Sequence, residues 1–230
     1  MKNVKLKGIV LRSIDYKENS KICYMLTEEG IISIKALGTK GYKNKNFNFS
    51  EILNNCEMEI TDSDFPSLID YSLINSYSNI KKNFKNLSYV SMMLEATKAL
   101  NGQLSYKRIY TFLITMLNTI EEGNDARLAC AIYLIKLLMP LGIKPDFTSC
   151  SICRCNLPSY INPQNGQSYC ENERVKGISI NDIKTLYYFD ISKDLDSLDV
   201  DLNIVYKFIY EYYIYHLDIN LKKYDLVFEV

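Results

Sequence analysis

The hydrophobic pattern of this chain changes its period near residue 80, and this change constrains what each part can fold into. Before that point, apolar residues occur in short runs typical of β-strands, at residues 5–11, 21–27, 30–37, 57–61 and 71–74. About five short strands separated by turn residues are what an OB-fold needs. Residues 1–79 are therefore predicted to form a small β-barrel.

Beyond Asn79, apolar residues recur at spacings of three and four, which indicates helices. Residues 127–139 are apolar on nearly every side, follow the candidate cap Asp125 and end at Pro140, so they are predicted to form a buried central helix. That stretch is too short to span a membrane. Further helices are expected from Ser179 and over residues 202–221. The fold class is thus α+β, a β-barrel followed by a helical domain over residues 80–230.

Charge is balanced overall, since Lys plus Arg and Asp plus Glu both total 27, but it is unevenly distributed. Basic residues dominate residues 1–50, whereas residues 51–80 contain six acidic residues and no Lys or Arg. This pattern is compatible with a surface that faces a polyanion, or with a solvated surface of uneven charge. The basic residues of the first block are Lys2, Lys5, Lys7, Arg12, Lys17, Lys21, Lys35, Lys40, Lys43 and Lys45; the acidic residues of the second are Glu51, Glu57, Glu59, Asp62, Asp64 and Asp70.

A loop rich in Gly, Lys and Asn is expected at residues 38–47, between the third and fourth strands. Proteins that bind single strands need cations for phosphates and aromatic faces for bases, and OB-folds offer both. Aromatic residues at this spacing are more often packing residues, which is the competing interpretation. The candidate nucleic-acid contacts here are Lys35, Lys40, Lys43 and Lys45, interleaved with Tyr42, Phe47 and Phe49.

Four of the seven cysteines lie within residues 150–170. The N-terminus contains no apolar run of signal-peptide length, so a cytoplasmic protein is expected and the clustering favours a metal over disulfides. Cys150 and Cys153 have the spacing of a zinc half-site, and Cys170 supplies a third thiol after a turn-rich stretch.

The second half-site is incomplete, because position 173 holds a glutamate. Glu173 is a candidate fourth ligand through its carboxylate, which zinc accepts. Cys155 is the alternative, although a ligand only two residues beyond Cys153 fits poorly with the same tight turn. The prediction is one structural zinc ion, or else a degenerate knuckle whose cysteines are free or oxidised.

Catalytic motifs are missing from the sequence. His216 is the only histidine, and there is no G-x-S-x-G, no P-loop, no G-x-G-x-x-G and no H-E-x-x-H. An enzyme using a thiolate of the cysteine cluster would need a general base nearby. His216 is expected to be a packed or capping residue, and the chain is predicted to be a binding protein and not an enzyme.

The order of these features resembles the RecO family. Residues 8–12 (Gly-Ile-Val-Leu-Arg), 16–22 and 26–33 are similar to that family's opening, and a Gly- and Lys-bearing loop follows. The cysteine insert, residues 148–175, and the closing helix around residues 215–222 lie where the family has theirs. The resemblance covers nearly the whole chain and is more specific in its N-terminal part. The absence of a fourth cysteine at position 173 departs from zinc-bearing members.

The resemblance implies an N-terminal OB-fold, a helical domain with a zinc-knuckle-like insert, and a role as mediator of DNA repair and homologous recombination. Such a protein binds single- and double-stranded DNA, anneals complementary strands and works with RecR. It contacts the acidic C-terminal tail of the single-stranded DNA-binding protein and so helps to load RecA. The resemblance adds Arg12 to Lys35, Lys40 and Lys43 as DNA contacts. It also implies a cytoplasmic, nucleoid-associated protein without a membrane partner.

A rival function is a structural adaptor, in which an OB-like barrel and a helical domain recruit another protein through an apolar groove without useful affinity for DNA. The balanced net charge favours this alternative slightly. Salt dependence separates the two, because neutralising phosphates releases counterions and makes DNA affinity fall with salt.

Overall fold

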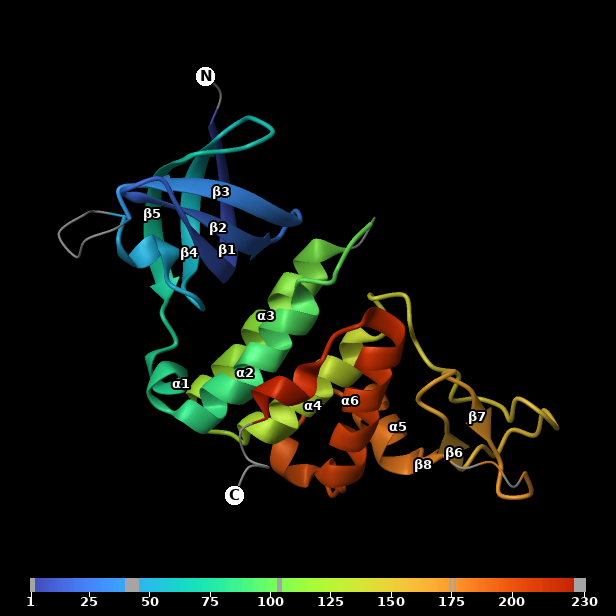
Figure 1. Ribbon diagram of the computed structural model, residues 1–230. Coiled ribbons are helices and arrows are strands. Elements are labelled where there is room, and N and C mark those ends of the chain that lie inside the picture. Colours follow the sequence, from blue (N-terminus) through green and yellow to red (C-terminus); the bar gives the residue numbers. More distant parts are fainter. Residues whose placement is uncertain (1–2, 40–45, 103–104, 174, 176, 226–230) are drawn as a thin grey trace. The chain divides into compact units, whose positions relative to one another are not determined.

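The computed structural model describes residues 3–39, 46–102, 105–173, 175 and 177–225. The chain divides into two compact units, which are described separately here (Figure 1). The barrel unit contains Met1–Lys82 and Gly102–Glu121, and the helical unit contains Asn83–Asn101 and Glu122–Val230. Helix α3 (Tyr106–Glu121) belongs to the barrel unit, whereas the single boundary predicted after residue 79 places it in the second part.

The barrel unit is built on a five-stranded antiparallel sheet in the order β3-β2-β1-β4-β5. An isolated β-bridge between Lys35 of β3 and Ser67, the residue before β5, joins the two edges of the sheet. The sheet therefore curls into a partly open barrel. The predicted OB-type barrel, and with it the α+β fold class, is confirmed. The strands are β1 (Asn3–Tyr16), β2 (Ser20–Thr27), β3 (Ile31–Leu37), β4 (Asn55–Thr61) and β5 (Leu68–Asn75).

Strand β1 is longer than predicted because it serves both halves of the barrel. Its first part pairs with β4 and its second part with β2, and Gly8 pairs with Thr27 on one side and Cys56 on the other. A Cβ at Gly8 would lie 2.9 Å from the Thr27 side chain and 3.0 Å from the Leu26 carbonyl oxygen. Only glycine leaves enough space there for the strands to approach so closely.

The barrel core is formed by side chains that alternate along the strands toward the interior. Its members are Leu6, Val10, Cys23, Met25, Ile34, Ala36, Phe49, Cys56, Met58, Ile60 and Leu68.

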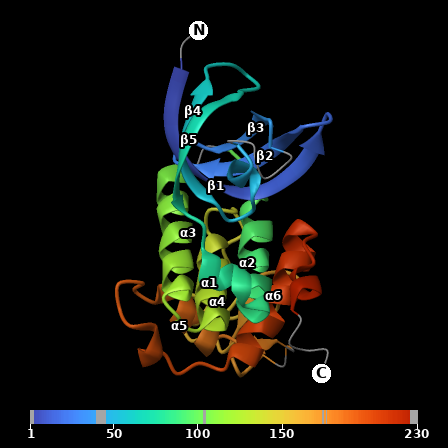
Figure 2. The same cartoon turned by 90° about the vertical axis from the view of Figure 1, so that its left-hand side faces the viewer.

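Helix α3, labelled in Figure 2, is attached within the barrel unit by hydrogen bonds near both of its ends. The hydroxyl of Tyr110 donates to Oδ1 of Asn55 at 2.7 Å, and both residues are buried. At the other end of α3, the Glu121 carboxylate accepts from the backbone N–H groups of Asn79 and Ile80, each at 3.0 Å. Those N–H groups start α1 (Ser78–Lys82) and have no partner within their own helix, so Glu121 acts as its cap.

The helical unit is organised around α4 (Ala126–Leu137), the predicted central helix, which is buried along nearly its whole length. The Asp125 side chain accepts from the N–H groups of Arg127 and Leu128, as its sequence position predicts. Helix α4 packs against α2 (Phe84–Thr97), α5 (Asn181–Tyr188) and α6 (Leu202–Leu217).

Three helix boundaries differ from the sequence pattern. The helix expected from Ser179 begins at Asn181, because Ser179 pairs with Tyr160 as part of a short strand. The apolar series from Ile80 to Leu94 is interrupted at Asn83, whose side chain accepts from the Asn86 N–H and starts α2 separately from α1. Helix α6 ends at Leu217 because Asp218 adopts a left-handed conformation (φ 57°), and a short 3-10 helix follows at Leu221–Tyr224. Among the described residues, no helix combines the length and apolar character that a membrane crossing needs.

The cysteine insert contains a three-stranded sheet of very short strands in the order β7-β6-β8. These are β6 (Tyr160–Ile161), β7 (Ser168–Tyr169) and β8 (Ile178–Ser179). Six strand residues contribute few backbone hydrogen bonds, so the insert needs other sources of stability.

We expect Tyr110→Phe to destabilise the barrel unit by about 1–3 kcal/mol, because it leaves the buried Oδ1 of Asn55 without its donor. The measurement is urea-induced unfolding. The matched control is Tyr106→Phe on the same helix, at a half-buried position, which should change the free energy of unfolding by less than about 0.5 kcal/mol. Equal effects of the two variants would contradict the assigned role of the Tyr110 hydroxyl.

Candidate functional site

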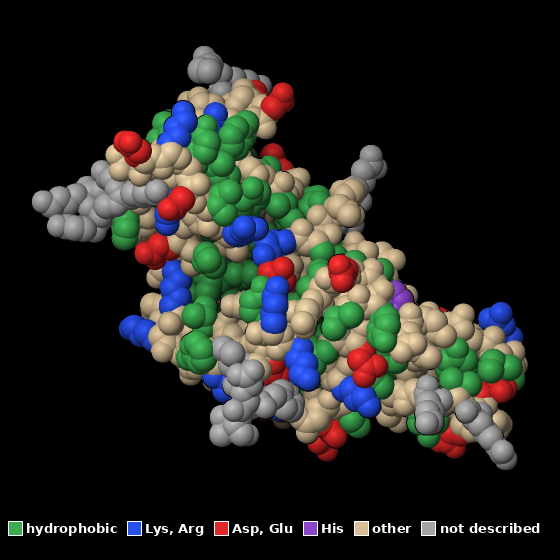
Figure 3. Space-filling view, in the orientation of Figure 1, with side chains coloured by type: hydrophobic (Ala, Val, Ile, Leu, Met, Phe, Trp, Pro, Cys, Tyr) green, Lys and Arg blue, Asp and Glu red, His purple; other side chains and the backbone are tan. Residues whose placement is uncertain are grey.

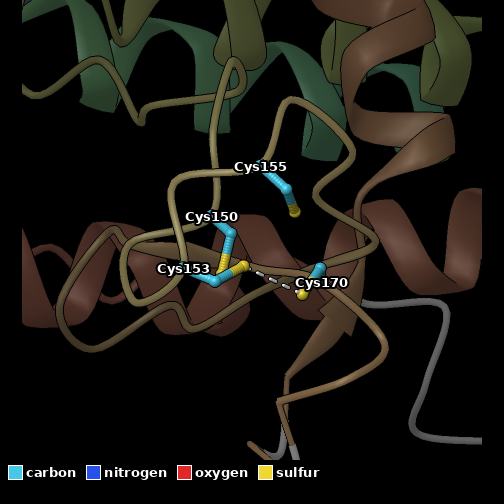
Figure 4. Close-up of side chains that lie close together, drawn as sticks. All are labelled: Cys150, Cys153, Cys155 and Cys170. Carbon is cyan, nitrogen blue, oxygen red and sulfur yellow. Dashed lines mark hydrogen bonds between the residues drawn. The ribbon is translucent and has the colours of Figure 1, made fainter.

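Four thiols of the cysteine insert converge at one point (Figure 4). The sulfur atoms of Cys150, Cys153, Cys155 and Cys170 all lie within 4.8 Å of one another. Cys150 and Cys170 are buried, Cys155 is half-buried and Cys153 is exposed. The Sγ atoms of Cys153 and Cys170 are 3.6 Å apart and form the hydrogen bond drawn in Figure 4.

A left-handed residue brings Cys155 into the cluster. Arg154 has a φ of 63°, which reverses the chain direction between Cys153 and Cys155. Two backbone hydrogen bonds close this loop: the Cys150 N–H donates to the Cys155 carbonyl at 2.9 Å, and the Arg154 N–H donates to the Cys150 carbonyl at 3.0 Å. The close spacing of Cys153 and Cys155, which argued against Cys155 in the sequence, is therefore accommodated by one strained residue.

Glu173, the first candidate for the fourth ligand, is not in this cluster. Its backbone N–H donates to the Cys170 carbonyl at 3.2 Å, within a turn after β7. The structure thus groups Cys150, Cys153 and Cys170 as the sequence predicts, and it adds Cys155 in place of Glu173. Glu173 was favoured as fourth ligand because the usual zinc site has two turns with ligands three residues apart. The folded loop instead provides three thiols from residues 150–155.

The four thiols fit a zinc ion by chemistry and by spacing. In a regular tetrahedron with Zn–S distances of about 2.3 Å, the sulfur atoms are about 3.8 Å apart. The cluster is close to that spacing, with 3.6 Å between Cys153 and Cys170 and no separation above 4.8 Å. Burial raises the pKa of Cys150, but backbone hydrogen bonds from Cys153, Cys170 and Ile152 outweigh it and lower that pKa to about 6. These hydrogen bonds favour the thiolate form of Cys150. At Cys153 a backbone hydrogen bond from Cys155 lowers the pKa, but side-chain hydrogen bonds with the other three thiols outweigh it and raise the pKa to about 12.

The other three cysteines have the opposite environment. Cys23, Cys56 and Cys130 are fully buried, and burial raises their pKa values to about 11, 12 and 12 respectively. Such thiols remain protonated and behave as small apolar side chains.

The second candidate site lies on the outer surface of the barrel, where the strand registers align two rows of side chains. In the first row Arg12 lies opposite Tyr24, which lies opposite Ser33. In the next row Ile14 lies opposite Ile22, which lies opposite Lys35. We call these six residues the open face, since Arg12 is exposed and the other five are half-buried.

The open face brings together two of the predicted DNA contacts, Arg12 and Lys35. The ammonium of Lys35 lies 4.6 Å from the centre of the Phe65 ring, which holds it by a cation–π contact. Tyr24 lies beside Arg12 and was not identified from the sequence. Its position follows from the register of β1 against β2, which is shifted between Val10 and Arg12 and is not readable from local pattern.

The remaining predicted contacts, Lys40, Tyr42, Lys43 and Lys45, lie outside the described residues. Phe49 is fully buried and packs edge-to-face on Tyr71 with ring centres 5.2 Å apart, so it is a core residue. This is the packing role that the competing interpretation of these aromatic residues gives.

Three residues of the acidic block lie on β4 and β5. Glu57, Glu59 and Asp70 line a groove of about 210 Å³ together with Lys5 and Tyr71. Lys5 and Lys7 on β1 lie directly opposite Glu59 and Glu57. Figure 3 shows basic, acidic and apolar side chains together on the visible face of the barrel unit, so neither charge dominates there. Among its six residues, the open face on β1–β3 contains two cationic side chains and no acidic one, so it suits an anionic ligand better than the acidic groove does.

His216 has the structural role expected of it. Its ring stacks on Tyr212 with centres 4.1 Å apart, and its Nε2 lies 3.0 Å from the Pro163 carbonyl oxygen. The side chain thus joins α6 to the cysteine insert within the helical unit.

Comparisons with known proteins identify a family for both parts of the chain. Residues 1–77 match the family described as Recombination protein O N terminal, and residues 81–225 match Recombination protein O C terminal. Similar curated proteins include the DNA repair protein RecO of Bacillus cytotoxicus, of Bacillus mycoides and of Bacillus cereus, each 30% identical over 152 residues. Those matches cover 65% of this chain and 61% of each relative's length. The two family matches together extend over most of the sequence, and the chain therefore belongs to the RecO family.

Proposed function

We propose that this protein is a recombination and DNA-repair mediator that binds DNA through the open face of its barrel and anneals complementary strands without catalysing a covalent reaction. The observation that carries the proposal is the alignment of Arg12, Tyr24 and Lys35 on one face of an OB-type sheet. Family membership supports the same role, with RecR, RecA and the acidic tail of the single-stranded DNA-binding protein as partners. The proposed location is the cytoplasm, at the nucleoid.

The chemistry of the open face suits a single strand. The guanidinium of Arg12 and the ammonium of Lys35 would neutralise phosphates, which releases counterions and drives binding. The ring of Tyr24, between Arg12 and Ser33, would offer a stacking surface for a base without selecting its identity. Annealing needs only that strands be held and neutralised, so no catalytic group is required.

We further propose that the cysteine cluster binds one structural zinc ion through Cys150, Cys153, Cys155 and Cys170. Zinc would supply coordination bonds that link the loop 150–155 to the end of β7. An insert with only short strands has little core of its own, so metal coordination would be part of its folding free energy.

For DNA binding, we expect Arg12→Gln to weaken affinity for a single-stranded oligonucleotide and to lower the log–log salt slope by about 0.7, the share of one phosphate contact. Fluorescence anisotropy over a salt series measures both quantities. Lys7→Gln is the matched control, an exposed β1 cation opposite Glu57, and should leave the slope unchanged. Binding by the unmodified protein that is absent or independent of salt would instead favour the adaptor function.

For base stacking, we expect Tyr24→Leu to weaken single-strand binding by about 1–3 kcal/mol while the salt slope stays constant, since no charge is lost. The same anisotropy series provides the measurement. Tyr188→Leu on α5, a 60% exposed tyrosine of the helical unit, is the control. If Tyr24→Leu binds as tightly as the unmodified protein, the ring does not contact a base.

For the metal, we expect purified protein to contain one zinc ion, and Cys155→Ser to lose it far more readily to a chelator than Glu173→Gln does. Elemental analysis and a chelator competition series give the content and the relative affinity. Chelation of the unmodified protein should also lower the thermal unfolding temperature of the helical unit. Retention of zinc by Cys155→Ser and its loss from Glu173→Gln would restore the carboxylate as the fourth ligand.

A further inference from the structure

The four thiols of the cysteine cluster are not equivalent, and their differences indicate a specific oxidation chemistry. Cys153 is exposed to solvent, whereas Cys150 and Cys170 are 0% and 4% exposed. Cys153 is therefore the residue of the cluster that an oxidant dissolved in water reaches most readily. Burial also shields Cys23, Cys56 and Cys130, which are each 0% exposed. Among the described residues, the thiols that an oxidant can reach therefore lie in the cluster.

The hydrogen-bonded neighbour of Cys153 is Cys170, with 3.6 Å between their Sγ atoms. Figure 4 shows the two sulfur atoms directed toward each other from different segments, the loop 150–155 and the end of β7. A disulfide needs about 2.05 Å between sulfurs, so a side-chain movement of less than about 2 Å closes the gap. Cys170 is therefore in position to resolve a first oxidation at Cys153.

We propose that Cys153 and Cys170 form an oxidation site, at which a hydroperoxide converts the two thiols into a disulfide. In the first step the Cys153 thiol loses its proton and the thiolate sulfur attacks one peroxide oxygen. The O–O bond breaks and the departing hydroxide takes up a proton, which gives a sulfenic acid and one water. In the second step the Cys170 sulfur attacks the sulfenic sulfur, the S–O bond breaks, and the hydroxyl leaves as a second water. Two thiols are oxidised and one hydrogen peroxide is reduced to two waters.

This disulfide and a zinc ion exclude each other, because both use the same two sulfur atoms. Oxidation would leave Cys150 and Cys155 as the only thiol ligands, and two thiols do not complete a tetrahedral site. A thiol reductant would restore all four ligands. The metal-releasing consequence rests on the proposed zinc site, whereas formation of the disulfide rests only on the positions of the thiols.

Peptide mapping tests the pairing directly. Trypsin cleaves after Arg154 but not after Lys144, because Pro145 follows it. Cys150 and Cys153 therefore fall in the peptide of residues 137–154. Cys155 and Cys170 fall in the peptide of residues 155–174. Full-length protein treated with a chelator and then with one equivalent of hydrogen peroxide should give a cross-link between these peptides. Fragmentation by mass spectrometry should assign that cross-link to Cys153 and Cys170.

Two variants that each remove one cluster thiol make the comparison sharp. In the chelated protein, Cys153→Ser should reduce the yield of inter-peptide cross-link by about tenfold, because the exposed thiol starts the reaction. Cys155→Ser should retain the Cys153–Cys170 cross-link. Circular dichroism of both variants checks that they are equally folded, and the mapping of the unmodified protein decides the pairing if they are not.

Metal release is measured separately on the unmodified, zinc-loaded protein with a colorimetric zinc indicator. The expected result is one zinc released for each disulfide formed, and rebinding after reduction. A cross-link between any other pair, or oxidation of Cys153 to sulfinic acid without a cross-link, overturns the proposal. If the protein contains no zinc, the metal proposal fails, and the mapping of the chelated protein still decides the oxidation site.

Discussion

The barrel depends on the way in which one strand, β1, is shared between two sheet halves. Gly8 lies where β4 and β2 both pair with β1. The register shift between Val10 and Arg12 comes next along the chain. A shift of one residue moves every later side chain to the opposite face, which sends Arg12 outward and keeps Ser13 on the inner side opposite Cys23. The open face exists because of this bulge. Without it, Arg12 would point into the core opposite buried residues.

The cysteine cluster also depends on one local irregularity of the backbone. A single left-handed residue, Arg154, turns the chain so that three thiols of a six-residue loop face a fourth, Cys170, which follows β7. The surrounding sheet is made of two-residue strands, which cannot hold such a loop by backbone hydrogen bonds alone. The thiols converge beside the hydrogen bond that the Ser151 N–H donates to the Ser168 carbonyl at 2.8 Å, so both contacts lie where the loop 150–155 meets β7.

The two sites place different demands on charge. The proposed DNA contact needs cations on one surface of a chain with no net charge, and the six residues of the open face include two cations and no acid. Glu57, Glu59 and Asp70 lie on the β4–β5 side, where Lys5 and Lys7 offset part of their charge, and Arg12 and Lys35 lie on the open face. Overall charge balance is thus compatible with a local surface for a polyanion.

The sequence by itself determined the fold class, the buried helix α4 with its Asp125 cap, and three of the four clustered thiols, because these depend on periodicity and short spacing that local physics reads directly. Tertiary structure decided what depends on register and on chain reversal. It brought Cys155 to the other three thiols through the backbone conformation of Arg154, and it placed Tyr24 beside Arg12 through the bulge in β1. It also attached α3 to the barrel through Tyr110 and Asn55, which lie 55 residues apart. The Tyr24–Arg12 and Tyr110–Asn55 pairings depend on where separate backbone segments meet. The placement of Cys155 depends on a left-handed backbone conformation that sequence spacing does not indicate.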